Sequence, residues 1–311
     1  MRVPAINSWL SPADIGRRVS VRRQASDGLH DTVGTLVAWE GAPRGELLIR
    51  TRDGGVHRVT ASSITAGRVV APAVSALRLQ EIAEAAWPVT DSEHLGQWNL
   101  RFGGGKAWRT NSARLCGDPG NDTAAALEFV RAWYERRGVP GLVQTPDPGA
   151  FDSHLVSAGW VPDTSTQVMV RTVTADHAQH ARAVVEVTEA PTPEWRTVAA
   201  PDLARGLDAP LERAHHQRFI TVFDDGQPVS VGRIVAQSQW GIATSVRTIS
   251  EAQRQGFART TMAVINDVAR ELGVGNLFLQ VLEANEAGMS LYRDLAFETH
   301  HRYRYFLAPT A

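Results

Sequence analysis

The spacing of apolar residues changes along the chain and separates a strand-rich region from a region of alternating helices and strands. Up to residue 70 the apolar residues form short runs interrupted by turns, and Asp53-Gly54-Gly55 is typical of a tight hairpin turn. This pattern predicts five short strands, over residues 18–23, 32–39, 46–51, 56–60 and 67–70. Five strands joined in this way favour a small all-β barrel.

After this region, one order of helical and strand patterns occurs twice. The two copies can be aligned by counting residues. Phe297 lies twelve residues after Asn285, and Trp160 lies twelve residues after Pro148. The first copy predicts a helix over 124–137, a strand over 141–144, a helix over 150–158 and a strand over 166–171. The second copy predicts a helix over 261–272, a strand over 277–282, a helix over 287–295 and a strand over 302–307. The repetition indicates two α/β halves in tandem.

Further elements complete each half. The first half is expected to begin with a helix over 76–86 and two strands around Gly103–Gly105, a loop that we interpret as a hairpin turn or bulge. In the second half we expect a strand over 184–187, a helix from Pro193, a hairpin over 218–235 and a strand over 242–249. Polar residues 174–180 separate the halves, so the predicted domains are 13–71, 74–172 and 182–311.

One loop in the second half has the features of an anion-binding site. The stretch Gln253-Arg254-Gln255-Gly256-Phe257-Ala258 lies between the strand at 242–249 and an amphipathic helix. A helix that begins on such a loop directs free backbone N–H groups and the positive end of its dipole into one small space. Gly256 lets the backbone approach a ligand closely, so we expect a pyrophosphate to bind here.

This loop, of the form Gln/Arg-x-x-Gly-x-Gly/Ala, resembles the coenzyme A loop of the GNAT superfamily of acetyl-CoA-dependent N-acetyltransferases. A second GNAT signature matches as well, with Asn285, a small residue at 287, Leu291-Tyr292 and Ala296-Phe297. The resemblance is specific over 184–311 and faint over 74–171. It implies an α/β (α+β) GNAT fold with a central mixed, mostly antiparallel sheet in tandem halves. The N-terminal barrel resembles an SH3-like domain.

The resemblance also implies a map of the active site. It assigns the acetyl and pantetheine contacts to the backbone of Val246, Arg247 and Thr248, where a splay between the fourth and fifth strands leaves peptide groups unpaired. It assigns the pyrophosphate and the rest of the coenzyme to the residues Gln253, Arg254, Gln255, Gly256, Phe257, Ala258, Arg259, Asn285, Ala287 and Ser290. Tyr292 is the expected general acid; the alternative is a core tyrosine. A second role expected for Asn285 is to cap the following helix through its side chain.

A general base is missing from the expected position. Members of the superfamily often carry Glu or Asp on the fourth strand, but residues 237–248 contain no acidic residue and no histidine. Glu283, His215 and His216 are candidates if the fold brings them to the amine. A water relay, or an amine that is already partly neutral, needs no protein base.

The first copy lacks the residues that the chemistry requires. Pro148 stands in place of Asn285, and Leu155 in place of Tyr292. The segment Gly117–Asp122 faces the phosphate position, where its two acidic residues would repel a pyrophosphate. We therefore expect the first half to support the second rather than to bind acetyl-CoA.

Composition narrows the alternatives. A net charge of −1 gives no general attraction to nucleic acid or membranes, and the single Cys116 excludes an internal disulfide. His300 and His301 point to opposite faces of a strand, so we expect no metal site. The absence of a signal sequence and of a membrane-spanning stretch predicts a cytoplasmic protein.

Two functions remain in competition. The first is an N-acetyltransferase that uses acetyl-CoA to modify a primary amine of a small metabolite, or a lysine or N-terminus of a protein. The second is a regulatory protein that senses acyl-CoA and whose barrel binds nucleic acid or a protein partner through Arg17, Arg18, Arg22 and Arg23. A solvated strand edge also explains these arginines. The order of a barrel before a GNAT region resembles a bacterial group described as histone-acetyltransferase-like.

Overall fold

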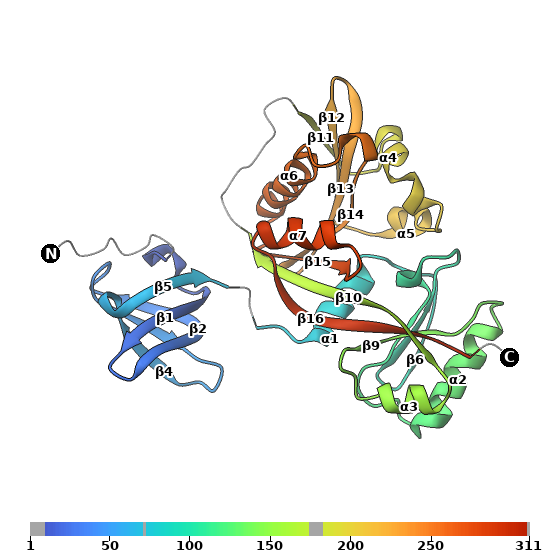
Figure 1. Cartoon of the computed structure of the whole chain (residues 1–311), viewed down its shortest axis with the longest axis horizontal. Coiled ribbons are helices and arrows are strands. Elements are labelled where there is room, and N and C mark those ends of the chain that lie inside the picture. Colours follow the sequence, from blue (N-terminus) through green and yellow to red (C-terminus); the bar gives the residue numbers. More distant parts are fainter. Residues whose placement is uncertain (1–9, 71–72, 174–182, 310–311) are drawn as a thin grey trace. The chain divides into compact units, whose positions relative to one another are not determined.

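The computed structural model describes residues 10–70, 73–173 and 183–309, and the chain divides into two compact units, Met1–Val74 and Ser75–Ala311 (Figure 1). The polar segment 174–180, on which the predicted boundary between the halves rests, lies outside the described residues, as do positions 71 and 72. No helix in the described residues has the length and the apolar character that crossing a membrane requires.

The first unit is a five-stranded antiparallel sheet in the order β4-β3-β2-β1-β5. Its strands are β1 (Arg18–Ala25), β2 (Gly28–Glu40), β3 (Glu46–Arg50), β4 (Val56–Thr60) and β5 (Ile64–Val69), with the short 3-10 helices η1 (Pro12–Asp14) and η2 (Ala61–Ser63). Burial alternates along β1 and β3 because successive side chains point to opposite faces. The buried face carries Val19, Val21, Leu36, Leu47 and Ile49. The five predicted strands are confirmed.

The second unit contains one eleven-stranded sheet in the order β11-β12-β13-β14-β15-β10-β16-β9-β8-β7-β6. The strands of its first half are β6 (Asp91–Leu95), β7 (Trp98–Phe102), β8 (Ala113–Arg114), β9 (Leu142–Pro146) and β10 (Val161–Thr172). Those of its second half are β11 (Val184–Thr188), β12 (Gln217–Asp224), β13 (Gln227–Gln237), β14 (Trp240–Thr248), β15 (Asn276–Leu282) and β16 (Glu298–Leu307). The sequence pattern had missed β6.

Seven helices accompany this sheet within the described residues. They are α1 (Ala76–Ala85), α2 (Thr123–Glu135), α3 (Asp152–Ser157), α4 (Pro193–Leu203), α5 (Asp208–Arg213), α6 (Phe257–Glu271) and α7 (Glu286–Asp294), with the 3-10 helices η3 (Trp108–Thr110) and η4 (Ser250–Ala252). The predicted order of the second half, β-α-α-β-β-β-α-β-α-β, is confirmed.

The same local arrangement occurs twice in the large sheet. The elements β8-α2-β9-α3-β10 and β14-α6-β15-α7-β16 follow one order, and each contains a parallel strand pair, β8 with β9 and β14 with β15. The other strand pairs of the described residues are antiparallel, so the sheet is mixed and mostly antiparallel.

The two halves exchange strands. β10 of the first half lies between β15 and β16 of the second, pairing with β15 from Thr166↔Leu282 to Thr172↔Asn276. β16 in turn pairs with β9 of the first half, from Tyr303↔Pro146 to Leu307↔Leu142. Figure 1 shows β10 and β16 crossing side by side through the middle of the unit. Neither half has a complete sheet without a strand from the other.

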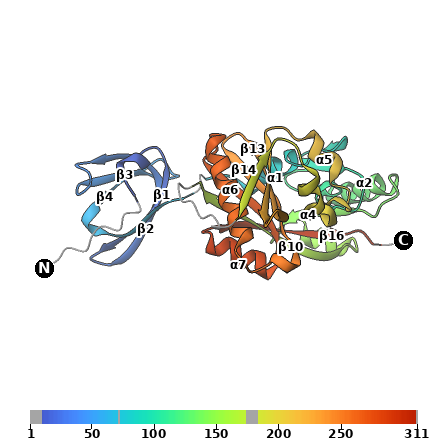
Figure 2. The same ribbon diagram turned by 90° about the horizontal axis from the view of Figure 1, so that it is seen from above.

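Helices cover both faces of the second half. Figures 1 and 2 show α6 and α4 on opposite sides of β13 and β14. α6 is amphipathic and turns Phe257, Met262, Ile265 and Val268 into the core. On the other face the ring of Trp195 in α4 lies edge-on to Phe219, with centroids 5.0 Å apart.

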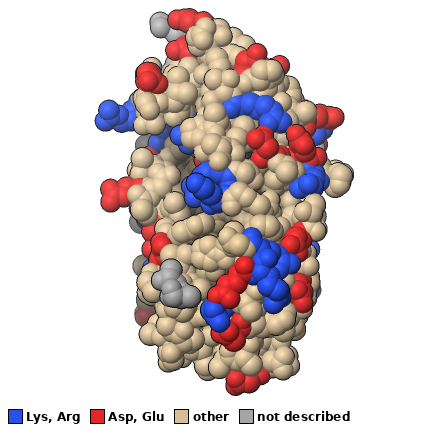
Figure 3. Space-filling model, turned by 90° about the vertical axis from the view of Figure 1, so that its right-hand side faces the viewer, with Lys and Arg blue, Asp and Glu red and all other residues tan. Residues whose placement is uncertain are grey.

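Basic and acidic side chains alternate on the face of the molecule in Figure 3, without a broad patch of one sign. The first unit shows the same mixing at its arginines. Arg22 forms a two-bond ion pair with Asp31, at 2.7 and 2.8 Å, and Arg17 pairs with Asp14 at 3.1 Å. These two arginines are therefore neutralised within their own unit.

Candidate active site

The parallel strands β14 and β15 diverge halfway along their length. They pair from Trp240↔Asn276 to Ala243↔Leu279, and no further. Beyond this point β14 continues to Thr248 against β13, while β15 continues to Leu282 against β10. The register of β14 on β13 also shifts between Val231 and Arg233, opposite Ser245, which has a φ of 52°. A bulge at Ser245 therefore bends β14 away from β15.

A cavity of about 520 Å³ is lined by the diverging strands. Residues 243–247 of β14 and 279–282 of β15 form one part of its wall, and Asn285 and Tyr292 contribute from the region of α7. The remaining lining residues are Trp87, Ala107, Trp108, Arg109, Thr164, Thr166, Asp202, Arg205, Leu207, Tyr303 and Tyr305. The volume is in the range of small-molecule and cofactor sites. Among the predicted coenzyme residues, Val246, Arg247 and Asn285 line this space.

The predicted phosphate loop leads directly into α6. Arg254 has a φ of 60°, and Gly256, at the N-cap, has a φ of 94° in the left-handed region. No side chain caps the helix, so its first turn presents backbone N–H groups at the positive end of the dipole. Phe257 is buried in the core and Arg259 pairs with Asp294. Any anion bound here is therefore held mainly by the backbone.

The corresponding helix of the first half differs in this respect. Asp122 is the N-cap of α2, and its carboxylate accepts hydrogen bonds from the N–H groups of Ala124 and Ala125, at 3.1 and 3.2 Å. The donors that an incoming phosphate would need are thus occupied by a negative charge. The first N–H groups of α2 are therefore occupied by the Asp122 carboxylate, whereas no side chain caps α6.

Tyr292 and Asn285 project from α7 and its N-cap. The Tyr292 ring is 8 % exposed and lies 5.9 Å from the Phe297 ring, and burial alone raises the pKa of the phenol to about 12. Oδ1 of Asn285 accepts a hydrogen bond from the N–H of Gly288 at 2.9 Å, so the predicted capping role is observed. Ala287 and Ser290 are exposed on α7 and do not line the cavity.

The opposite wall comes from residues that sequence reasoning missed. Trp87 follows α1, and Trp108 and Arg109 lie on η3, all within the half expected to shape and support the second one. The rings of Trp108 and Tyr305 are 5.2 Å apart. Trp108 and Arg109 come shortly after the glycine loop, but nothing in their spacing links them to the C-terminal strand. The first half therefore forms part of the cavity itself.

Three buried polar atoms of the lining residues have no hydrogen-bond partner in the described residues. They are Nε1 of Trp87, Oγ1 of Thr166 and Oγ1 of Thr244. Burying such a group without a partner costs roughly 1–3 kcal/mol, so native structures rarely leave them unsatisfied. All three atoms are shielded from solvent, so they lie within the cavity wall and not at its surface.

Few titratable groups can act as a base in this cavity. Asp202 is its one carboxylate among the described residues, and it lies 3.7 Å from Arg247. Glu283 accepts from Nε2 of Gln167 at 3.1 Å and does not line the cavity; neither do His215 and His216. In the described residues, His, Cys, Asp and Glu side chains form no cluster suited to a metal ion.

Comparison with known proteins agrees with this geometry. The family model described as "Probable histone acetyltransferase Rv0428c C-terminal" matches residues 74–306. The chain is 25 % identical over 320 residues to the probable histone acetyltransferase Rv0428c of Mycobacterium tuberculosis (strain ATCC 25618 / H37Rv), covering 94 % of this chain and 95 % of that protein. It is 22 % identical over 242 residues to the uncharacterized N-acetyltransferase YobR of Bacillus subtilis (strain 168), covering 73 % and 97 %.

A solved structure shows the same fold. The GCN5-related N-acetyltransferase from Kribbella flavida superimposes with a TM-score of 0.61 at 16 % identity, covering 76 % of this chain and 96 % of that one. The fold and the matching relatives define an acetyltransferase of the GNAT type. Within that class, the chain belongs to the family of the Rv0428c C-terminal region.

Proposed function

We propose that this chain transfers the acetyl group of acetyl-CoA to a primary amine, with the thioester held in the opening between β14 and β15. The observation that carries the proposal is the divergence of these strands beyond Ala243 and Leu279, which opens into a cavity lined by Tyr292. The amide-rich pantetheine arm can pair with the exposed strand edge as an added strand would. The backbone of Val246, Arg247 and Thr248 is the part of β14 that would receive it.

The pyrophosphate of the coenzyme is proposed to bind at the start of α6. The left-handed conformation of Gly256 and the uncapped first turn support this position. Gln253 and Gln255 already donate side-chain hydrogen bonds to the backbone oxygens of Thr248 and Glu251, at 3.3 and 2.8 Å. These bonds hold the loop in place, so the loop is shaped before a ligand arrives.

Tyr292 is proposed to assist the departure of the thiol. The amine nitrogen attacks the acetyl carbon, the C–S bond breaks, and negative charge develops on sulfur. A phenol with a pKa of about 12 stays protonated at neutral pH and faces the cavity. Complete proton transfer to a thiolate with a pKa of about 8.5 would be uphill. The phenol therefore acts by donating a hydrogen bond to the developing thiolate.

The proton of the attacking ammonium leaves through solvent in this proposal. Asp202 lies on the cavity wall but is engaged with Arg247. Since the described lining offers no other carboxylate and no imidazole, the neutral fraction of the amine limits the rate. The rate is then expected to rise with pH toward the pKa of the acceptor amine.

The organisation of the chain is part of the proposal. We propose that residues 13–71 form an SH3-like barrel, and that 74–172 and 182–311 are tandem GNAT-like halves of which only the second binds acetyl-CoA. The repeated element order, with one parallel pair in each half, supports the tandem arrangement. The Asp122 cap on α2 supports a single coenzyme site.

The test is the release of CoA from acetyl-CoA across a panel of primary amines. We expect turnover with at least one amine, and a fall in kcat of about 10- to 100-fold for Tyr292→Phe, the range of a hydrogen bond to a charged group. The coenzyme should bind this variant as it binds the wild type, which calorimetry measures. Normal turnover in Tyr292→Phe would remove the phenol from the mechanism. Tight binding of acetyl-CoA without turnover of any amine would favour the acyl-CoA sensor instead.

A further inference from the structure

The cavity has an unbalanced positive charge at one end. Two guanidinium groups lie near the ring of Trp87, with the Cζ of Arg233 4.7 Å and the Cζ of Arg109 5.7 Å from its centroid. Among the described residues, neither arginine forms an ion pair with a carboxylate. Two like charges close to a buried ring repel each other unless an anion joins them.

Arg233 shows that this charge is buried at a cost. Its partners are neutral: Nε donates to Oε1 of Gln217 at 2.8 Å and Nη2 donates to the backbone oxygen of Ala86 at 3.0 Å. Nη1 is buried without a partner. Burial, followed by the charge of Arg109, lowers the pKa of the guanidinium to about 9. Buried charges without a counter-charge are rare and are often functional.

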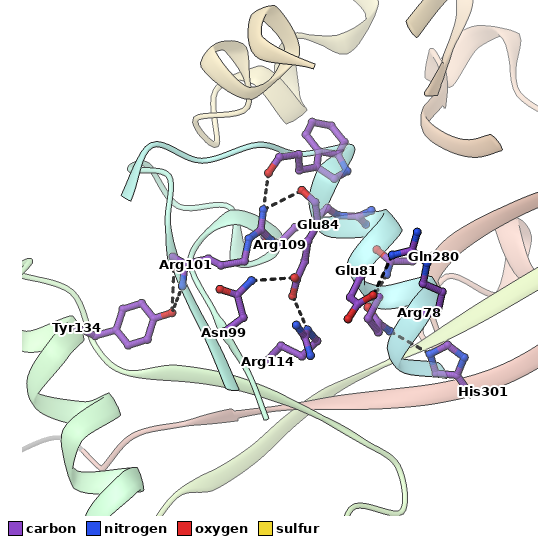
Figure 4. A network of polar contacts seen from close by, with 12 residues as sticks. Arg78, Glu81, Glu84, Asn99, Arg101, Arg109, Arg114, Tyr134, Gln280 and His301 are labelled. Atoms are coloured by element: carbon purple, nitrogen blue, oxygen red, sulfur yellow. Dashed lines mark hydrogen bonds and ion pairs between the residues drawn. The ribbon is translucent and has the colours of Figure 1, made fainter. Parts of the chain in front are cut away.

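A second buried arginine of the same region is balanced. Arg114 pairs with Glu84 at 2.8 Å, and Asn99 donates to the same carboxylate (Figure 4). The fold therefore places a carboxylate beside Arg114 and none beside Arg109 or Arg233. Arg101 is also buried and donates only to backbone oxygens, but it does not line the cavity. Arg109 does line it, so a ligand in the cavity can supply the missing counter-charge.

The segment that carries Arg109 is connected to the end of α1 and to Arg205 by hydrogen bonds. Nη1 of Arg101 donates to the backbone oxygen of Arg109 at 2.9 Å, and its Nη2 donates to the Glu84 backbone oxygen at 3.1 Å, in the network of Figure 4. The same Nη2 also donates to the backbone oxygen of Trp87. On the other side, the N–H of Lys106 donates to the backbone oxygen of Arg205 at 2.8 Å. Arg101 thus ties the Arg109 backbone to the end of α1, and the Arg109 side chain lines the cavity.

Two of the three other charged residues of the lining are basic. Arg205 and Arg247 are basic, and the one acid, Asp202, lies beside Arg247. A lysine-rich peptide would meet repulsion here. An amine that also carries an anionic group would be attracted.

Resting on the acetyltransfer proposed above, we propose that the acceptor is a small primary amine that also carries a carboxylate, and that Arg109 binds this carboxylate. The planar guanidinium can hold both carboxylate oxygens at once. The rings of Trp87, Trp108 and Tyr305 provide an apolar wall for the body of the acceptor. The amine end then points toward the thioester between β14 and β15.

The experiment compares matched acceptors on the full chain. α-Amino acids and ω-amino acids of increasing length are each paired with their amides, and a lysine-rich histone-tail peptide is added. We expect kcat/KM for the best carboxylated acceptor to exceed that for its amide by about 10- to 100-fold, the range of a charged hydrogen-bonded pair. Calorimetry of the same pairs on CoA-saturated protein measures the preference without turnover.

Two variants at position 109 and one control variant test whether Arg109 causes the preference for carboxylated acceptors. Arg109→Gln is expected to raise KM for the carboxylated acceptor about 10-fold or more relative to KM for the amide, and Arg109→Lys is expected to restore part of the difference. The control Arg136→Gln removes an equal charge from the exposed end of α2 and should retain the preference. The thermal unfolding midpoint and the acetyl-CoA affinity of Arg109→Gln, compared with the wild type, show that the variant is folded.

The outcomes separate the two proposals. Acetylation that ignores the carboxylate, or that favours the histone-tail peptide, overturns the acceptor class and leaves the acetyltransfer intact. A preference that survives in Arg109→Gln overturns the role of Arg109. Absence of acetyl-CoA binding and turnover overturns the proposed function, and calorimetry of the same carboxylate and amide pairs on the protein without CoA then decides whether the anion site exists.

Discussion

Burial restricts Tyr292 to one protonation state over the working pH range. The ring is 8 % exposed, and the sole cause of the raised pKa is loss of solvent. A phenolate in this position would be an uncompensated buried charge, so the side chain remains a neutral donor. The pH dependence of the reaction near neutrality should therefore come from the acceptor amine and not from Tyr292.

The same pKa shift predicts an effect on stability. The phenol has a pKa of about 10 when unfolded and of about 12 when folded. Because the folded value is raised, the stabilisation is complete below pH 10 and is lost as the pH rises toward 12. At pH 11, between the two pKa values, the loss is on the order of 1 kcal/mol. Tyr292→Phe lacks this loss, so the difference in unfolding free energy between wild type and variant should shrink by that amount between pH 8 and pH 11. Urea unfolding at both pH values measures it, and a constant difference would contradict the raised pKa.

At the scale of single elements, the start of α6 carries the proposed pyrophosphate site. Gly256 has a φ of 94°, where a Cβ is unfavourable by roughly 1–2 kcal/mol. We expect Gly256→Ala to move the first-turn N–H groups and to raise the Kd for acetyl-CoA about 10-fold, since hydrogen bonds to charged groups contribute roughly 1.5–3 kcal/mol. Isothermal titration of acetyl-CoA measures the change.

A matched control lies at the other end of the same helix. Gly273, just beyond the C-cap of α6, has a φ of 70°, and a Cβ at this position would meet no other atom within 4 Å. Gly273→Ala should therefore cost similar stability and leave the Kd unchanged. An equal loss of affinity in both variants would assign the effect to general destabilisation of α6.

Most helices and strands could be predicted from the sequence, but the cavity wall formed by the first half could not. Strand and helix patterns depend on local spacing, which is why β14, α6, β15 and α7 could be placed from sequence. The positions of Trp87 and Arg109 depend instead on Arg101, a buried side chain that joins three backbone oxygens distant in the sequence. No local periodicity contains that information. The missed strand β6 has a similar cause, because its residues are mostly exposed.

At the scale of the whole large unit, the exchange of β10 and β16 was also beyond sequence reasoning. The repeated order of elements predicts two similar halves, but it does not say which half each terminal strand joins. The sheet order shows that β10 fills the position between β15 and β16. The second half therefore depends on the first half for a strand. The first half also provides the cavity wall that carries Trp87, Trp108 and Arg109.

This dependence leads to a test with separated pieces of the chain. Without β10, a fragment of residues 183–311 would expose the edges of both β15 and β16, with up to seven and eight residue pairs lost. Unpaired strand edges of this kind favour aggregation. We expect the fragment alone to be aggregated or unfolded, and co-expression with residues 73–173 to restore a soluble complex that releases CoA from acetyl-CoA. Size-exclusion chromatography and circular dichroism measure the first outcome, and the CoA release assay measures the second.

The control is residues 75–311, which retain every residue lining the cavity and should acetylate amines as the full chain does. A monomeric, active fragment 183–311 would show that the shared sheet is unnecessary, because the second half would then complete its fold by itself.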